Sequence, residues 1–120
     1  MSQRAFVLAE QIRQVLSYAL SFEMRDPELH GITVTRVKLS PDLQFVDVRF
    51  FYYDEAKTPQ TVLAALNRAK GAFKRLIAGK VAMRRVPELR FHFDEDMASE
   101  QKIEEILKNL EIPEQEQDES

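Results

Sequence analysis

The sequence contains no cysteine, few histidines and no long apolar run, and each shortage excludes a class of protein. Without cysteine, the 120-residue chain has neither a disulfide framework nor a thiolate zinc site. No apolar run approaches the roughly 18 residues that a membrane span needs, and the N-terminus becomes charged too early for a signal peptide. We therefore expect one soluble, cytoplasmic domain with no membrane partner.

Signatures of catalysis and metal binding are also missing. The sequence contains no nucleophile elbow, phosphate-binding loop, dinucleotide fingerprint or zinc-protease motif. His30 and His92 are far apart and have no partner histidine at metal-ligand spacing, so both are expected to be surface or edge residues. The acidic residues 94–96 lack the spaced ligands and the glycine of a calcium loop. We predict that the chain is not an enzyme and holds no metal ion or cofactor.

Charge is sorted along the chain, although the net charge is only −3. Residues 57–90 carry nine Lys/Arg and one Asp/Glu, a net charge of +8. Residues 1–56 have a net charge of −2, and residues 91–120 have a net charge of −9. A basic middle beside an acidic end indicates that one part of the chain binds a polyanion.

Apolar spacing predicts an α+β domain. Helical periodicity marks residues 4–24, 59–69, 72–84 and 99–110, and Thr58-Pro59 forms a strong helix start. Strand patterns cover residues 32–39, 44–53 and 89–93, with a slip in the first that predicts a bulge near Arg36. We expect one small sheet with helices on one face, formed by residues 1–110. Residues 111–120 are polar and acidic and are predicted to be a disordered tail.

The basic run and the interruption in its helical pattern form the candidate nucleic-acid-binding site. Lys and Arg neutralise phosphates, and a helix beginning after Gly71 would present its N-terminal amides to an anion. A glycine there also lets a phosphate approach the backbone closely. A solvated helix face and a glycine kept for packing remain alternatives. The candidate residues are Arg68, Ala69, Lys70, Gly71, Lys74, Arg75, Lys80, Arg84 and Arg85.

Four consecutive aromatic residues, at positions 50–53, have two interpretations. They can stack RNA bases, as aromatics do on RNA-binding sheets. They can also belong to the core, because alternate residues of a strand point to one face. The second interpretation is favoured, since Phe50 and Tyr52 share the parity of Val46 and Val48, which are expected to be buried.

Three segments resemble the ribosome-binding factor A family, in the expected order and spacing over residues 4–110. The first is RDP at 25–27 with ITVTRV at 32–37 and SPDL at 40–43. The second is AKG at 69–71 with Leu76-Ile77. The third is RVPEL at 85–89 with Phe91, Phe93 and Asp94. Glu28 and Lys102 depart from the family pattern.

The resemblance implies a type II KH-like fold in the order helix, strand, strand, helix, kink, helix, strand, with a short C-terminal helix. Ala69-Lys70-Gly71 would replace the usual Gly-x-x-Gly loop. The resemblance also implies a cytoplasmic, monomeric ribosome biogenesis factor. Such a factor binds the free small (30S) subunit and 16S rRNA during late maturation and rRNA processing, and acts in growth at low temperature. The family positions near the RNA correspond to Lys70, Lys74, Arg75, Arg84 and Arg85.

Two other functions fit the residues. One is a KH-like domain that binds another structured RNA. The other is a protein-interaction module whose basic face meets an acidic partner.

Overall fold

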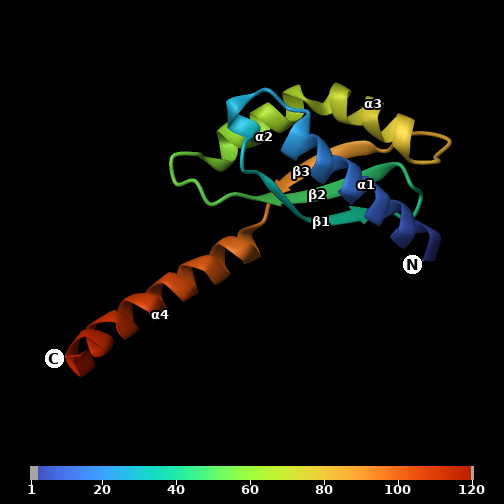
Figure 1. The fold of residues 1–120 in the computed structure, drawn as a ribbon. Coiled ribbons are helices and arrows are strands. Elements are labelled where there is room, and N and C mark those ends of the chain that lie inside the picture. Colours follow the sequence, from blue (N-terminus) through green and yellow to red (C-terminus); the bar gives the residue numbers. More distant parts are fainter. Residues whose placement is uncertain (1–2, 120) are drawn as a thin grey trace.

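Within residues 3–119, the part that the computed structural model describes, three helices cover one face of a three-stranded sheet (Figure 1). Only the backbone is described for residues 111–119. The elements are α1 (Gln3–Phe22), the 3-10 turn η1 (Pro27–Leu29), β1 (Thr33–Leu39), β2 (Phe45–Phe51), α2 (Pro59–Arg68), α3 (Lys70–Lys80), β3 (Glu88–Phe93) and α4 (Glu95–Glu119). The predicted α+β class and element order are confirmed.

The sheet combines a hairpin with a crossover. β1 and β2 are antiparallel, whereas β2 and β3 are parallel and are connected through α2 and α3. Pairing along β1 passes from Val34–Phe50 to Arg36–Arg49, which leaves Thr35 as an additional residue. The predicted bulge near Arg36 is confirmed. It lies beside the start of α4, because Thr35 contacts Asp94, the residue before that helix.

One apolar core lies between the helices and the sheet. Ile12 of α1, Val48 of β2 and Phe73 and Ile77 of α3 are each 0% exposed. The rings of Phe73 and Phe91 lie 5.9 Å apart and join α3 to β3. Burial of each large side chain contributes about 1.5–3 kcal/mol. The core therefore holds α3 firmly against the sheet.

α4 differs most from the sequence prediction. It begins at Glu95, four residues before the expected start, because Asp94 caps it: the Met97 N–H donates to the Asp94 carboxylate at 3.0 Å. The helix projects away from the sheet (Figure 1). Four of its large apolar side chains are 52–65% exposed, namely Ile103, Ile106, Leu107 and Leu110. The backbone of α4 continues to Glu119, whereas the sequence predicts a short helix that ends at residue 110. The division into a domain of residues 1–110 and a disordered tail of residues 111–120 remains a prediction.

The described residues lack two kinds of feature. No helix there has both the length and the apolar content to cross a membrane. No group of three or more acidic or histidine side chains lies there in a position to hold a metal ion.

Candidate nucleic-acid interface

α2 begins where the sequence predicts. The Thr58 hydroxyl accepts a hydrogen bond from the Thr61 N–H at 3.2 Å, and Pro59 occupies the first helical position. The Thr61 hydroxyl in turn accepts from the Thr58 N–H at 3.4 Å, completing a capping box. This cap fixes the start of α2, the helix that leads to the candidate site.

A single residue separates α2 from α3. The Ala69 N–H donates to the carbonyls of Ala65 and Leu66, at 3.1 Å each, and the Ala69 carbonyl accepts from the Phe73 N–H at 3.0 Å. Helical bonding therefore continues almost unbroken through the kink. α3 spans 70–80 rather than the predicted 72–84, because Val81 adopts an extended conformation.

Gly71 is exposed on the first turn of α3 and has a helical backbone. A Cβ added there would meet only the Arg75 Nη1, at 3.5 Å, which is an ordinary contact with the end of a flexible side chain. Neither conformation nor packing requires glycine here. Because Gly71 has no side chain, the backbone beside the guanidinium of Arg75 is uncovered.

Three of the predicted cations pair with carboxylates. Lys74 and Lys70 both reach Glu88, at the start of β3, over 2.6 Å and 3.4 Å. The hydrogen bond from Lys74, assisted by Lys70, lowers the pKa of Glu88 below its usual value. Arg68 contacts Asp26 at 3.0 Å. Part of the positive charge on this surface is thus neutralised by the protein itself.

The remaining predicted cations have no ion pair among the described residues. Arg75, Arg84 and Arg85 are exposed, the last two in the loop between α3 and β3. Lys80 is also exposed and lines a hollow between α1 and α3 with Val15 and Tyr18. The sequence-predicted residues 68–85, which we call the α2–α3 surface, extend over the end of α2, α3 and the loop that follows it.

The aromatic run belongs mainly to the core. Phe50, Phe51 and Tyr52 are 1%, 6% and 9% exposed, so their ring faces are not available to RNA bases. Burial of Phe51 was not predicted, because its parity places it on the wet side of β2. Contacts with Phe93 and Tyr53, at centroid distances of 5.9 Å and 5.0 Å, cover it instead.

A second group of cations was missed by the sequence analysis. Arg36 and Lys38 of β1 and Arg49 of β2 come together on the sheet face opposite the helices. They lie outside the basic run, in a region whose net charge is negative. The signals that could have located them are the outward parity of Arg49 and the bulge near Arg36.

Comparison with known proteins assigns this arrangement to a family. The family model described as ribosome-binding factor A matches residues 4–107. The chain belongs to the ribosome-binding factor A family. A ribosome-binding factor A of Thermomicrobium roseum is 34% identical over 99% of this chain and 92% of that protein. One from Sorangium cellulosum is 36% identical, covering 90% and 89%.

Solved ribosome-binding factor A structures share the fold. The crystal structure from Thermus thermophilus has a TM-score of 0.66 and 30% identity, over 73% of this chain and 93% of that chain. A Thermus thermophilus ribosome-binding factor A model fitted into a cryo-EM map of a 30S–RbfA complex has a TM-score of 0.59 and 30% identity, over 71% and 89%. The predicted KH-like fold is confirmed.

Proposed function

We propose that this chain is a cytoplasmic, monomeric ribosome biogenesis factor. It binds the free small (30S) subunit through 16S rRNA during late maturation and rRNA processing, and catalyses no reaction. The observation that carries the proposal is the set of exposed arginines in α3 and in the loop after it, in a chain of this family. Arg75, Arg84 and Arg85 have no counter-ion among the described residues. Unpaired guanidiniums are well suited to phosphates, which they can bind in a bidentate manner.

The 30S–RbfA complex of the Thermus thermophilus relative supports this partner. Gly71 supports the position of the contact, since the exposed backbone at the kink lets a phosphate come close. The α2–α3 surface would then hold the RNA backbone through charge and shape. Binding of this kind weakens steeply as salt rises, because counterions are released on association.

The test is co-sedimentation with purified small subunits and complete ribosomes across a salt series. We would compare the wild type with a triple variant in which Arg75, Arg84 and Arg85 become alanine. The matched control replaces three exposed cations elsewhere with alanine: Arg4, Lys102 and Lys108. We expect salt-sensitive binding to the free subunit, reduced on the order of tenfold in the first variant and little changed in the control.

Other outcomes distinguish the alternatives. Equal binding of both variants would reject the α2–α3 surface while leaving the ribosomal partner intact. No binding to small subunits at low salt would reject that partner, and crosslinking in cells would identify another RNA. A protein partner predicts association that survives nuclease treatment.

The role in maturation and in the cold has its own test. Cells depleted of the protein should accumulate unprocessed 16S rRNA and free small subunits, and should grow more slowly at low than at moderate temperature. The wild-type chain should restore both properties, and the Arg75/Arg84/Arg85 variant should not. Normal rRNA processing after depletion would contradict this role.

A further inference from the structure

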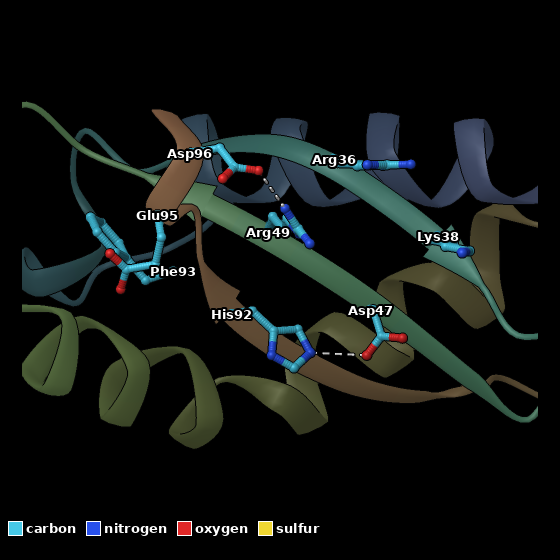
Figure 2. A pocket seen from close by; sticks show the side chains of 8 residues that line it. All are labelled: Arg36, Lys38, Asp47, Arg49, His92, Phe93, Glu95 and Asp96. Atoms are coloured by element: carbon cyan, nitrogen blue, oxygen red, sulfur yellow. Dashed lines mark hydrogen bonds and ion pairs between the residues drawn. The ribbon is translucent and has the colours of Figure 1, made fainter. Parts of the chain in front are cut away.

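The sheet has a face opposite α1–α3 (Figure 1), and this face carries a cluster of charged side chains (Figure 2). Alternation along the strands directs these side chains away from the core. They line an open hollow of about 560 Å³. We call this surface the open face; its side chains include Arg36, Lys38, Asp47, Arg49, His92 and Asp96.

The strand register brings like charges together on the open face. Arg36 of β1 lies directly opposite Arg49 of β2, and Lys38 follows two residues farther along β1 on the same face. Directly opposed like charges destabilise an antiparallel pair. Such an arrangement becomes favourable when an anion lies between the cations.

The carboxylate that faces Lys38 across the strand pair is engaged elsewhere. Asp47 lies opposite Lys38 in the strand register, but it accepts two hydrogen bonds from Arg90, at 2.9 Å and 3.0 Å. It is also 2.9 Å from the ring Nε2 of His92. Both partners lie on β3, on the far side of β2 from Arg36 and Lys38. Within the part of the chain that the structure describes, Arg36 and Lys38 have no ion pair.

Arg49 has a weak partner at the start of α4. Asp96 approaches it at 3.5 Å, and the Asp96 side chain is 87% exposed (Figure 2). A pair so exposed contributes little to stability and exchanges readily for another anion. Asp96 thus occupies a place that a stronger anion can take.

We propose that the open face is a second phosphate-binding surface, where Arg36, Lys38 and Arg49 bind the backbone of an RNA segment and Asp96 competes with it. This inference rests on the proposed function in taking RNA as the ligand. Exposed guanidinium and ammonium groups on a polar surface suit phosphates, whereas the centre of a protein interface is depleted in charged residues. Because the sheet separates this surface from the helices, the domain contacts RNA on two sides.

The test compares two variants of equal charge. The open-face variant replaces Arg36, Lys38 and Arg49 with glutamine, and the control does the same at the exposed Arg4, Lys102 and Lys108. The open-face variant is expected to fold, since it removes like-charge repulsion and one weak ion pair. We expect its affinity for small subunits and for protein-free 16S rRNA to fall on the order of tenfold. The salt slope should decrease by about 0.7–0.9 for each lost phosphate contact.

A second variant gives the opposite sign. Asp96→Asn removes the competing carboxylate and should strengthen binding severalfold, whereas Glu104→Gln, an exposed α4 carboxylate farther along, should not. The Asp96 effect should vanish when Arg49 is already glutamine. An equal gain in the Asp96 and Glu104 variants would overturn the competition and leave only a general charge effect.

The outcomes separate this inference from the proposed function. If the open-face variant binds as the control does while the Arg75/Arg84/Arg85 variant is impaired, the open face is not a binding surface and the proposed function stands. Loss of affinity for intact subunits but not for protein-free 16S rRNA would place a ribosomal protein there and overturn the RNA assignment. If the wild type fails to bind small subunits, the proposed function fails. The open-face variant and the control would then be compared on a generic structured RNA. Equal binding of that RNA by both would overturn the inference too.

Discussion

Thr35 donates a 2.6 Å hydrogen bond to the carboxylate of Asp94 and so joins the bulge of β1 to the start of α4. Asp94 is 9% exposed and also accepts from the Met97 N–H, while its own N–H donates to the Phe50 carbonyl at 2.8 Å. The charged oxygens of Asp94 are thus satisfied by both the sheet and the helix. This link fixes the point at which α4 leaves the domain.

Replacement of Asp94 by alanine should lower the free energy of unfolding by about 1–2 kcal/mol, because it removes a helix cap and leaves the Thr35 hydroxyl without its acceptor. Thr35→Val should cost less, since the cap to Met97 remains. Urea unfolding measures both. Asp96→Ala is the control, an exposed position whose effect should stay within about 0.5 kcal/mol. Equal stability of the Asp94 and Asp96 variants would contradict the role of the link.

Stability should decline in acid partly through Asp94. The hydrogen bond from Thr35, together with that from the Met97 N–H, lowers the pKa of Asp94 in the folded protein. The unfolded chain, with an aspartate pKa of about 3.9, therefore takes up the proton first as pH falls. The contribution is complete above about pH 5 and is lost as pH falls through the folded pKa.

Unfolding midpoints measured between neutral pH and about pH 3 test this sign. The Asp94→Asn variant lacks the titrating group, so its stability should fall less steeply than that of the wild type. Parallel curves for the two proteins would assign acid sensitivity to other carboxylates, among them Glu88 and Asp26, whose pKa values are also lowered.

Glu88→Gln should strengthen binding to the small subunit. The change releases Lys74 and Lys70 from the carboxylate that pairs with both. Two freed ammonium groups should raise the affinity for the subunit severalfold. The slope of log affinity against log salt should become steeper by the amount expected for about one more phosphate contact, or for two. Glu104→Gln on α4 makes the same change in net charge away from the lysines. If both variants gain equally, the effect is one of net charge, and the lysines do not contact the RNA.

Gly71→Ala should keep the fold and weaken RNA binding. The added methyl group meets only Arg75, and alanine is favoured over glycine in a helix by up to about 1 kcal/mol. The unfolding midpoint should therefore rise or stay constant while affinity falls, because the methyl group holds a phosphate away from the backbone. Gly79→Ala, whose Cβ would meet nothing within 4 Å, is the matched control and should leave affinity unchanged. Unaltered binding of the Gly71 variant would exclude close phosphate approach at the kink.

Local signals predicted much of the fold because each depends on neighbouring residues. The Thr58-Pro59 start follows from capping chemistry, and the bulge near Arg36 follows from a slip in alternation. The early start of α4 was missed because Asp94 caps it with help from Thr35, 59 positions away. Burial of Phe51 likewise depends on Phe93, which pairing of β2 with β3 brings near.

The candidate site was predicted less completely than the fold. The basic run indicated which residues are exposed around α3, but not that Glu88 neutralises Lys70 and Lys74. The contact of Glu88 with the two lysines depends on how α3 packs against the sheet through the core. Arg36 and Arg49 lie far apart in the sequence, in a region of negative net charge, and only strand register makes them neighbours.

The additional residue at Thr35 acts as a change of phase in β1. Counting by twos from the buried Val34 would turn Arg36 and Lys38 toward α1, and Val37 and Leu39 toward water. The bulge resets the count, so that Val37 and Leu39 pack inward and the two cations point outward. The alternation of inward and outward side chains before Thr35 is thus offset by one residue from the alternation after it. Without Thr35, the two parts of the strand would form one regular alternation with the same residues inside and outside. The bulge is therefore not needed to place these side chains on the correct faces. What the chain would lose is the hydroxyl that anchors α4.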